Sequence, residues 1–544
     1  MSEALKRLIA ERALVRSDSG IRITHADTNI REISWLFDIR AIFFKPEFLK
    51  EYTESFWKMF AHQLPFQVGG LETAGIPLVS AIVMSSIERG TPVNGFFIRK
   101  SRKREGLMKA IEGALTTEPV ILVDDLVNSG HTFRKQIAVL KDAGATVSDT
   151  FALVSFRPSS AYREIERGGT RVRSVFSLND FGIPLLPEEP AAAQSDEWRV
   201  LWKASGGKPS LEYVVPKSGP VVDEQHVYIG TDDGRMLCYS KESGVEVWSF
   251  RIGDHPPGKG IFSTPALHGG RIFFGAYDGN VYCLDAHDGT EVWRNTDADW
   301  IGSSPALAPK LDLLFVGLEF GLWGKRGGIA AIRMSTGKSV WRARTPELTH
   351  GSPLYIPEEN VVVIGSNDGI LYAYDARSGS ELWNVRTRGE IKYRPAYDKE
   401  RRLVLVNSFD GNLHALHVDD GTHAFAYSMG APSYSAPVTS GRLVYTASLD
   451  KHVYAIDLDT GKKLWSFATR GRIFASPIIE EGSLWIGSND GCLYELDPET
   501  GARRGFFQAT ERIVNAIAYD ARGQRFFVPT VANELYCLER NKNA

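Results

Sequence analysis

The chain has 544 residues, of which 43% are apolar and 24% are charged, as is typical of folded globular proteins. These proportions exclude a mainly disordered or fibrous protein, and no apolar stretch reaches the roughly 18 residues of a membrane-spanning helix. The net charge of −3 does not indicate a nucleic-acid partner. Because the chain starts without a secretory signal and has only four cysteines, we expect a cytoplasmic protein without a membrane partner or a disulfide framework.

The composition changes near residue 187. Residues 1–187 are net positive and residues 188–544 are net negative, and most of the tryptophans lie in the second part. Residues 184–198, PLLPEEPAAAQSDEW, are rich in proline, alanine and acids, as linkers often are. We therefore expect a first domain over residues 1–187, a linker over 188–196 and a second domain over 197–544.

The second domain repeats one pattern with a period of roughly 40 residues. The general form of a copy is a proline, an alternating strand, a D-G turn, a second strand, a T-G or S-G turn, and a strand with a tryptophan, although the eighth copy lacks the proline and one copy has Phe425 in place of the tryptophan. The last copy lacks the tryptophan strand, whereas the segment EWRVLWKAS with Trp202 precedes the first copy. Four short strands per repeat predict an all-β propeller with eight blades, closed by the 197–205 strand. Seven blades are the alternative.

These repeats resemble the tryptophan-docking blades of the pyrroloquinoline-quinone-like propellers, a family that includes quinoprotein dehydrogenases and an outer-membrane assembly scaffold. The adjacent cysteines that the dehydrogenases use near their cofactor are absent. Cys238, Cys283 and Cys537 stand where other copies have alanine. We therefore expect these cysteines to be packing residues and expect no quinone cofactor.

The first domain contains the segment VILVDDLVNSGHT, residues 120–132. The apolar run Val120 to Val123 predicts a buried parallel strand, and an amphipathic helix follows the small polar loop. Ligands of α/β sheets bind where strands end and helices begin, and such a loop can wrap a phosphate. Asp124 and Asp125 would suit a ribose diol or a magnesium bridge.

This segment resembles the signature of the type I phosphoribosyltransferases, which use phosphoribosyl pyrophosphate (PRPP). The resemblance implies an α/β domain with a parallel sheet flanked by helices. It also implies that Asp124 and Asp125 contact the ribose and, indirectly, the magnesium ion that accompanies PRPP. The loop that would hold the 5′-phosphate consists of Asn128, Ser129, Gly130, His131 and Thr132. The stretch GGLETAGIPL, residues 69–78, resembles the family's pyrophosphate loop and adds Glu72, Thr73, Ala74 and Gly75.

Three further stretches resemble orotate phosphoribosyltransferases. FIRKSRKREG, residues 97–106, is similar to their basic loop, which implies that Arg99, Lys100 and Lys103 act in catalysis together with Asp125. SWLFDIRAIF, residues 34–43, is similar to their N-terminal region. Arg157 in SFRPS is similar to their base-contacting arginine. Because the basic loop of these enzymes reaches across a dimer, we expect a homodimer.

Two departures from this pattern leave the function open. Glu105 stands where the basic loop of the family has histidine, and Ala74 stands where the bacterial orotate enzymes have lysine. One hypothesis is a transferase that moves the phosphoribosyl group of PRPP to orotate, another pyrimidine-like base or a different nitrogenous base. The alternative is a non-catalytic regulatory protein that senses PRPP or a nucleotide and uses the propeller as an interaction module.

The propeller also carries a candidate binding face. The insertion GLWGKRGG, residues 321–328, and the blade-to-blade connections are expected on one side of the ring. Basic and aromatic residues gather in these segments, although this half of the chain is net negative. We expect an anionic ligand or an acidic protein surface to bind there, at Trp323, Lys325, Lys392, Arg394 and Arg472.

Overall fold

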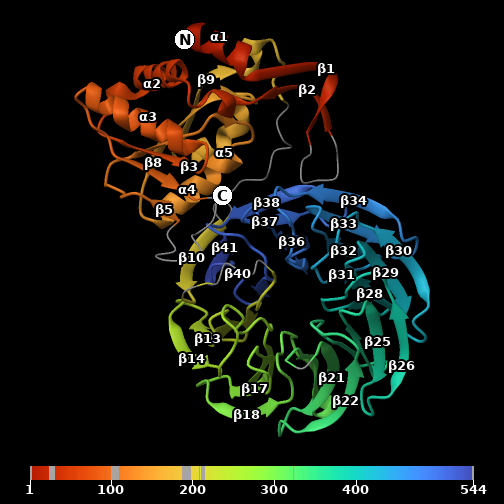
Figure 1. Ribbon diagram of the computed structural model, residues 1–544. Coiled ribbons are helices and arrows are strands. Elements are labelled where there is room, and N and C mark those ends of the chain that lie inside the picture. The colour runs from red at the N-terminus through yellow and green to blue at the C-terminus, as the bar shows by residue number, and fades with distance from the viewer. Residues whose placement is uncertain are drawn as a thin grey trace. The chain divides into compact units, whose positions relative to one another are not determined.

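The computed structural model describes residues 3–23, 31–99, 110–186, 198–207, 209, 215–322 and 324–541. The chain forms two compact units (Figure 1). The first consists of Met1–Ser195 with Gln508–Thr510, and the second consists of Asp196–Phe507 with Glu511–Ala544. The expected linker, residues 188–196, lies outside the described residues, as do Lys100, Lys103, Glu105 and Trp323.

The first unit is built on one sheet with the strand order β5-β4-β3-β6-β8-β7, and β9 pairs with β8. Neighbouring strands are parallel except for the antiparallel pair β4 and β5. The four residues of β6 are all β-branched or leucine and all buried, which suits a central parallel strand. The strands are β3 (Gln67–Leu71), β4 (Gly95–Ile98), β5 (Ile111–Glu112), β6 (Val120–Val123), β7 (Leu126–Val127), β8 (Val147–Ser155) and β9 (Arg171–Ser177).

Helices cover both faces of this sheet. One core joins α1 (Glu3–Arg12), α2 (Pro46–Phe60) and α3 (Gly75–Glu88) to the sheet, and a second core joins α4 (His131–Asp142) and α5 (Arg163–Arg167) to it. This arrangement confirms the predicted α/β fold. The remaining elements are the hairpin β1 (Leu14–Ile23) and β2 (Arg31–Phe37) and the 3-10 helices η1 (Ile39–Ile42), η2 (Ala61–Gln63), η3 (Ser159–Tyr162) and η4 (Leu178–Phe181).

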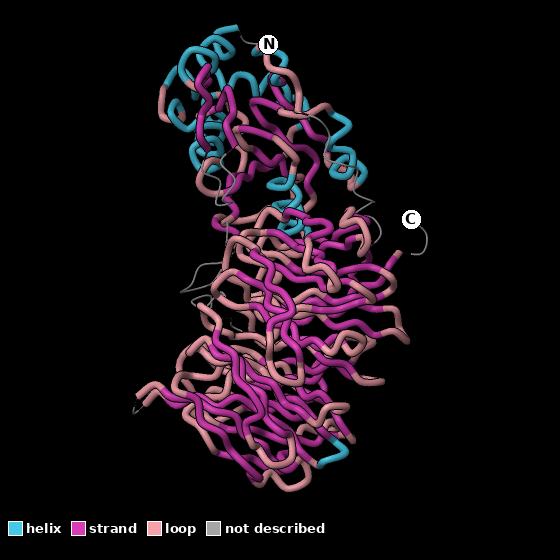
Figure 2. Tube along the Cα trace, turned by 90° about the vertical axis from the view of Figure 1, so that its right-hand side faces the viewer, coloured by secondary structure: helices cyan, strands magenta, loops and turns pink. Residues whose placement is uncertain are grey.

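The second unit is a ring of eight four-stranded antiparallel sheets, which confirms the predicted eight blades (Figure 1). It consists of strands and loops apart from the 3-10 helix η6 (Pro309–Leu311) among the residues that the structure describes (Figure 2). The blades are numbered in chain order from 1 to 8. Blades 1 to 4 contain β11 (Val221–Val222), β12 (His226–Gly230), β13 (Arg235–Ser240) and β14 (Glu246–Arg251); β15 (Ala266–His268), β16 (Arg271–Gly275), β17 (Asn280–Asp285) and β18 (Glu291–Thr296); β19 (Ala306–Ala308), β20 (Leu313–Phe320), β21 (Arg326–Arg333) and β22 (Ser339–Thr345); and β23 (Leu354–Ile356), β24 (Val361–Gly365), β25 (Ile370–Asp375) and β26 (Glu381–Arg386).

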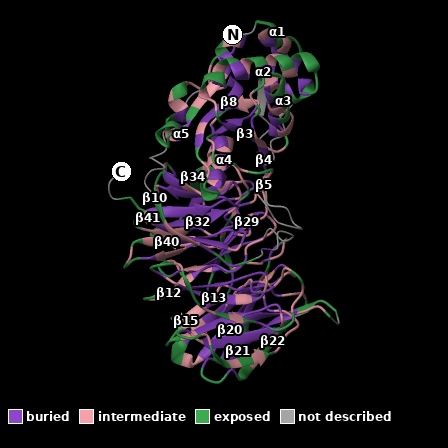
Figure 3. Ribbon diagram, turned by 90° about the vertical axis from the view of Figure 1, so that its left-hand side faces the viewer, coloured by how far each residue is buried: buried purple, intermediate pink, exposed green. Residues whose placement is uncertain are grey.

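Blades 5 to 8 follow the same order. They contain β27 (Ala396–Asp398), β28 (Leu403–Asn407), β29 (Asn412–His417) and β30 (His423–Ser428); β31 (Val438–Ser440), β32 (Leu443–Ala447), β33 (His452–Asp457) and β34 (Lys463–Ala468); β35 (Ile478–Glu480), β36 (Ser483–Gly487), β37 (Cys492–Leu496) and β38 (Arg503–Gln508); and β39 (Ala518–Asp520), β40 (Arg525–Pro529) and β41 (Glu534–Arg540) with β10 (Trp198–Ser205). The two middle strands of each blade are largely buried (Figure 3).

The repeated tryptophan joins six of the eight blades to the next blade. The indole of Trp383 donates a hydrogen bond to the carbonyl oxygen of Val418 at 2.7 Å, and five other tryptophans make the corresponding bond at 2.9–3.1 Å. The ring lies against the glycine of the neighbouring T-G or S-G turn. A Cβ atom on Gly421 would lie 2.7 Å from Trp383, and its φ of +73° is a conformation that favours glycine. The sequence pattern therefore encodes the contact between blades.

The ring closes through both ends of the second unit. β10 pairs with β41 and completes blade 8, and Trp202 in β10 donates to the carbonyl oxygen of Lys241 in blade 1 at 3.0 Å. Cys537 lies opposite Trp202 in the register, as Cys238 and Cys283 lie opposite Trp248 and Trp293. Alanine takes this place in blades 3 to 6, so the position accepts only a small side chain beside the aromatic ring.

None of the helices in the described part of the chain has the length and apolar character needed to cross a lipid bilayer.

Candidate functional site

The acid pair of the first unit lies between two strands of the sheet. Asp124 and Asp125 occupy the interval between β6 and β7, both of which pair with β8. The backbone N–H of Asp124 donates to the carbonyl oxygen of Phe151, and the N–H of Leu153 donates to that of Asp125, both at 2.9 Å. The sheet therefore fixes the backbone of both carboxylates at the carboxyl end of β6, where α/β proteins bind ligands.

Burial and like charge act on Asp124. Its side chain is buried, and the desolvation together with the neighbouring Asp125 raises the pKa of its carboxyl group well above the usual range. The positive charge of Arg40 opposes this effect only in part. Burial, together with the charges of Asp124 and Asp125, also raises the pKa of the Tyr52 hydroxyl, which has no hydrogen-bond partner among the described residues. Neither carboxylate forms an ion pair with a described residue.

The loop after the acid pair ends at the start of α4. Gly130 precedes the helix in the left-handed conformation (φ 71°), and a Cβ atom there would lie 2.8 Å from the Cδ1 atom of Ile165. The Tyr162 hydroxyl donates to the carbonyl oxygen of Val127 at 3.1 Å, and Arg134 Nη1 donates to that of Ser129 at 3.0 Å. These contacts hold the loop, and His131 and Thr132 form the first residues of α4. The free amides of a helix N-terminus suit a phosphate group.

A second loop connects β3 to α3. A Cβ atom on Gly70 would lie 2.9 Å from the Cα atom of Gly75, so the two glycines allow the strand and the helix to approach closely. Glu72, Thr73 and Ala74 form the short connection, in which Ala74 is buried and precedes the helix. An Ala74 side chain in this position offers no cation to a ligand.

The sequence-predicted cation Arg99 follows β4 directly. Its guanidinium group lies 3.4 Å from Glu112 and 3.9 Å from Glu72. The structure therefore brings one predicted catalytic residue to a residue of the predicted pyrophosphate loop. Lys100 and Lys103 remain outside the described residues.

The predicted base-contacting residue Arg157 follows β8. Its Nε atom donates a hydrogen bond to Oδ1 of Asn128 at 2.8 Å, so it lies beside the predicted phosphate loop. Sequence analysis did not single out Tyr52, Arg134 or Tyr162, which stand near the acid pair or support the loop. Their sequence neighbourhoods are ordinary amphipathic segments and carry no signal of this role. Arg40 lies within the segment 34–43, which the resemblance did include.

The donor set of the first unit fits PRPP and its magnesium ion. The two adjacent carboxylates have no cationic partner among the described residues. Hydrogen bonds from ribose hydroxyls, or a ligand that carries a metal ion, would therefore stabilise their negative charge. The glycine-capped start of α4 supplies amides for a phosphate. Asp124 and Asp125 would hold the ribose side of the substrate and, through PRPP, its magnesium ion.

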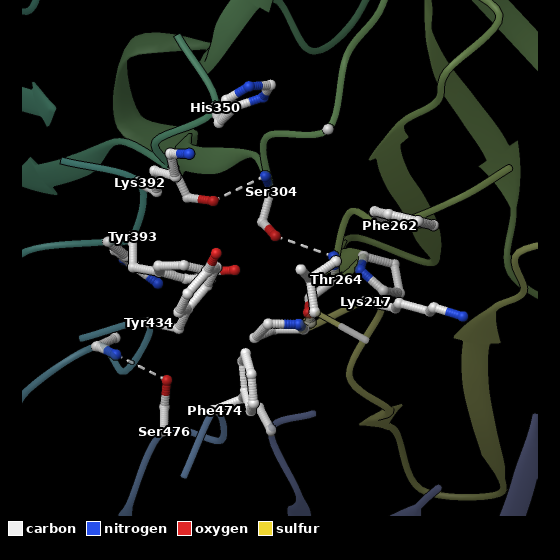
Figure 4. A pocket seen from close by; sticks show the side chains of 18 of the residues that line it. Lys217, Phe262, Thr264, Ser304, His350, Lys392, Tyr393, Tyr434, Phe474 and Ser476 are labelled. Carbon is white, nitrogen blue, oxygen red and sulfur yellow. Dashed lines mark hydrogen bonds between the residues drawn. The ribbon is translucent and has the colours of Figure 1, made fainter. Parts of the chain in front are cut away.

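Only some of the residues predicted for the binding face of the propeller lie together in the structure. Lys392 and Arg394 line a pocket of about 570 Å³ formed by the connections between blades (Figure 4). Lys325 is exposed in the short turn between β20 and β21, because the last residues of the 321–328 insertion extend β21. Arg472 is exposed two residues before Phe474, which does line the pocket. Trp323 lies outside the described residues.

The folds and the loops define the class of each unit: an α/β domain with the loop arrangement of the phosphoribosyltransferases and a tryptophan-docked propeller. The family model for the outer membrane protein assembly factor BamB matches residues 192–366, 325–439 and 367–505. These matches together span more than half of the chain, which therefore belongs to this propeller family. BamB from Moraxella catarrhalis has the same fold, with 18% sequence identity, a TM-score of 0.51, and coverage of 63% of this chain and 98% of that structure.

The first unit is similar in sequence to orotate phosphoribosyltransferases. The enzyme of Bradyrhizobium sp. (strain ORS 278) is 33% identical over 119 residues, which are 21% of this chain and 64% of the relative. That of Aquifex aeolicus is 28% identical over 179 residues, which are 33% of this chain and 96% of the relative. The chain thus spans slightly less than two thirds of the length of the Bradyrhizobium relative and nearly the full length of the Aquifex relative.

Proposed function

We propose that the first unit transfers the phosphoribosyl group of PRPP to a nitrogenous base of the pyrimidine type, such as orotate. The observation that carries this proposal is the acid pair, Asp124 and Asp125, held between β6 and β7 and followed by the glycine-capped N-terminus of α4. The sequence similarity to orotate phosphoribosyltransferases supports it.

In this reaction a ring nitrogen of the base forms a bond to C1 of the ribose while the bond from C1 to the pyrophosphate oxygen breaks. The pyrophosphate leaves with the electron pair, and the proton of the nitrogen goes to water. Because the carbon carries positive charge in the transition state, the protein acts chiefly by positioning the reactants and by stabilising the leaving charge. Magnesium bound with PRPP neutralises part of the pyrophosphate charge.

The described residues take separate roles in this scheme. Asp124 and Asp125 accept hydrogen bonds from the ribose hydroxyls, and these bonds offset the burial and the repulsion by Asp125 that raise the pKa of Asp124. The amides at the start of α4 and the hydroxyls of Ser129 and Thr132 hold the 5′-phosphate. Arg157, positioned by Asn128, contacts the base.

The cations assigned to the leaving group are Arg99, Lys100 and Lys103. Arg99 contacts Glu72 and Glu112 in this structure, so pyrophosphate has to compete with two acids for its guanidinium group. We expect Lys100 and Lys103, which follow in the same basic segment, to contact the pyrophosphate as well.

Calorimetric titration of the full chain with PRPP and magnesium tests the assignment of the site. We expect the double variant Asp124→Asn, Asp125→Asn to lose measurable affinity while it remains folded. Glu88→Gln, which removes an exposed carboxylate at the end of α3, is the matched control and should bind as the unchanged chain does. Equal affinity of the double variant and the control would refute the proposed site.

A second function, sensing of PRPP without turnover, is favoured by one observation. The buried Ala74 leaves the pyrophosphate loop without a side-chain cation, and a loop that holds but does not activate pyrophosphate suits a sensor. The two functions differ in a single measurable way. A sensor binds PRPP without releasing pyrophosphate in the presence of any base, whereas a transferase releases it.

A further inference from the structure

The charged side chains that line the pocket of the propeller are basic. Five basic side chains line its volume of about 570 Å³, and none of the described lining residues is an aspartate or a glutamate. A volume of this size is typical of small-molecule sites. The basic residues are Lys217, Lys259, His350, Lys392 and Arg394.

Most of these basic groups are already engaged. Lys217 pairs with Asp232 at 2.5 Å, His350 with Glu319 at 2.9 Å and Lys392 with Glu390 at 2.5 Å. These three acids lie outside the lining of the pocket. The side chain of Lys217 points away from the hollow in Figure 4. Lys259 lies over the ring of Tyr277 at 5.5 Å.

Arg394 differs from the other four. It forms no hydrogen bond or ion pair with any described residue, and it is exposed to the hollow. The surrounding protein nevertheless desolvates its guanidinium group and lowers its pKa. Desolvating an unpaired cation is unfavourable. An anion bound in the pocket would form a charge-assisted hydrogen bond with Arg394 without displacing a protein carboxylate.

Arg394 also breaks a pattern that the other seven blades keep. It occupies the position two residues before the first strand of its blade, where every other blade has a small residue. In several blades the hydroxyl at this position accepts a hydrogen bond from the backbone of the preceding blade, as Ser304 does from Thr264 and Ser352 from Ser304, both at 2.9 Å. Figure 4 shows these bonds around the hollow. The small residues are Gly219, Thr264, Ser304, Ser352, Ala436, Ser476 and Ala516.

The ring of small residues explains why the hollow exists, because small side chains leave the space near the axis open. A serine in place of Arg394 would fit the fold as well as it fits in blades 3, 4 and 7. The fold therefore does not require the arginine, and its side chain adds a charge donor to a space that the fold leaves open.

Aromatic side chains stand beside Arg394. Tyr434 lies 5.5 Å from Tyr393 and 5.0 Å from Phe474, measured between ring centroids, and all three line the pocket. The hydroxyl groups of Tyr393 and Tyr434 point into the hollow in Figure 4 and have no hydrogen-bond partner among the described residues. Aromatic rings with free hydroxyls suit a ligand that has both a flat apolar part and polar groups.

We propose that this pocket binds a small organic anion that carries a planar ring, of the size and class of a nucleoside monophosphate. Arg394 would pair with the anionic group, the hydroxyls of Tyr393 and Tyr434 would donate to it, and the aromatic cluster would contact the ring. A planar carboxylate shares this chemistry and is the second source that the experiment distinguishes. The proposal concerns the second unit alone and does not depend on the function proposed for the first.

The test is a calorimetric titration of the full chain that carries Asp124→Asn and Asp125→Asn, so that the proposed site of the first unit is silenced. The planar probes are uridine 5′-monophosphate and benzene-1,3,5-tricarboxylate. The probes without a planar ring are ribose 5-phosphate and citrate. Each is titrated into this chain and into the same chain with Arg394→Ser or Arg388→Ser. Arg388 is the matched control, because it is an exposed arginine of the same connection between β26 and β27, it lies outside the pocket, and its guanidinium group has no partner among the described residues.

We expect at least one planar anion to bind. Arg394→Ser should raise the Kd of that anion at least about tenfold, whereas Arg388→Ser should change it less than about twofold. The ringless partner of that anion should bind at least about tenfold more weakly. Binding of uridine 5′-monophosphate would identify a phosphate ester, and binding of the tricarboxylate alone would identify a carboxylate. Tyr434→Phe, which keeps the ring and removes the hydroxyl, should weaken binding several-fold.

Three results would overturn the proposal. These are no binding of either planar anion, equal affinity of the Arg394→Ser and Arg388→Ser chains, and equal affinity for planar and ringless anions. Capture of a polyglutamate peptide without binding of any small anion would also overturn it in favour of an acidic macromolecule. If Arg394→Ser melts at a lower temperature than the control, Arg394→Gln takes its place in the same titration.

Discussion

The Nε atom of Arg157 donates a hydrogen bond to Oδ1 of Asn128 at 2.8 Å and so joins the end of β8 to the loop before α4. The two residues are 29 positions apart in the chain. In the proposed reaction one contacts the base and the other belongs to the loop that holds the 5′-phosphate. The bond therefore couples the two halves of the proposed substrate site.

This coupling leads to a prediction about Arg157. Arg157→Gln should raise the KM for the base by about tenfold or more, because a charged hydrogen-bond donor is lost, while the affinity for PRPP changes little. Steady-state kinetics with varied base and calorimetry with PRPP measure the two effects. Asn128→Ala should raise the KM for the base less, since it removes only the positioning bond. An equal loss of affinity for PRPP and for the base in Arg157→Gln would contradict the separate roles.

Burial makes the stability of the first unit depend on the ionisation of Asp124. Because the folded state raises the pKa of this carboxyl group, folding favours the protonated form, and stability falls as the pH rises through that pKa. Asp124→Asn should therefore raise the melting temperature of the apo protein at pH 7 to 8, by about 2–4 °C for each kcal/mol gained. The gain should shrink towards pH 4, where the carboxyl group is also protonated in the unfolded chain, near its usual pKa of about 3.9.

Melting curves of Asp124→Asn and Glu88→Gln between pH 4 and pH 8 test this prediction. Glu88 is exposed, so its variant should follow the unchanged chain at every pH. A constant difference between Asp124→Asn and the unchanged chain across the pH range would show that ionisation is not the cause.

The contact between blades makes a prediction about glycine. Gly421→Ala and Gly430→Ala both place a side chain at a positive φ, of 73° and 83°, which costs about 1–2 kcal/mol. Only the Cβ atom at Gly421 also meets the ring of Trp383, at 2.7 Å, whereas nothing lies within 4 Å of that at Gly430. Gly421→Ala should therefore be less stable than Gly430→Ala by about another 1–3 kcal/mol, as overpacking predicts. Denaturant unfolding of the two variants measures the difference, and equal stabilities would contradict the docking of Trp383 on this turn.

A dimer is predicted from the basic segment. If Lys103 of one subunit acts at the site of the other, mixing a Lys103→Ala chain with an Asp125→Asn chain should restore part of the transferase activity that each variant lacks alone. Only subunits that share a site can complement each other in this way. Light scattering that shows a strictly monomeric chain, or a mixture as inactive as its components, would refute this arrangement.

The sequence predicts the propeller well because the same local geometry recurs from blade to blade, with a tryptophan that bonds to the next blade in six of the eight. The glycine of each T-G or S-G turn, the tryptophan and the small residue opposite it recur together, and each depends on the others for space. The acid pair could also be predicted, since the run Val120 to Val123 marks a buried strand and the two carboxylates follow it. In both cases the residues that determine the feature are close together in the chain.

Other parts of the two sites depend on contacts between distant residues. Tyr52 lies on the buried face of α2, which looks like any amphipathic helix, and only the folded sheet brings its hydroxyl near Asp124. The sequence places Arg394 among several basic residues of one propeller face. Only the structure shows that Lys392 pairs with Glu390, whereas Arg394 pairs with no described residue. An alignment of the eight copies of the repeat would have pointed to Arg394, because the other seven copies have a small residue at that position.

The most direct test of the proposed function is the release of pyrophosphate from PRPP by the full chain with magnesium and a panel of bases. The account predicts release that depends on one base of the pyrimidine type and that falls at least about 100-fold in the Asp124→Asn, Asp125→Asn variant. Arg394→Ser should leave this activity unchanged, because Arg394 belongs to the other unit. No release with any base from a chain that still binds PRPP, or release that survives the double substitution, would contradict it.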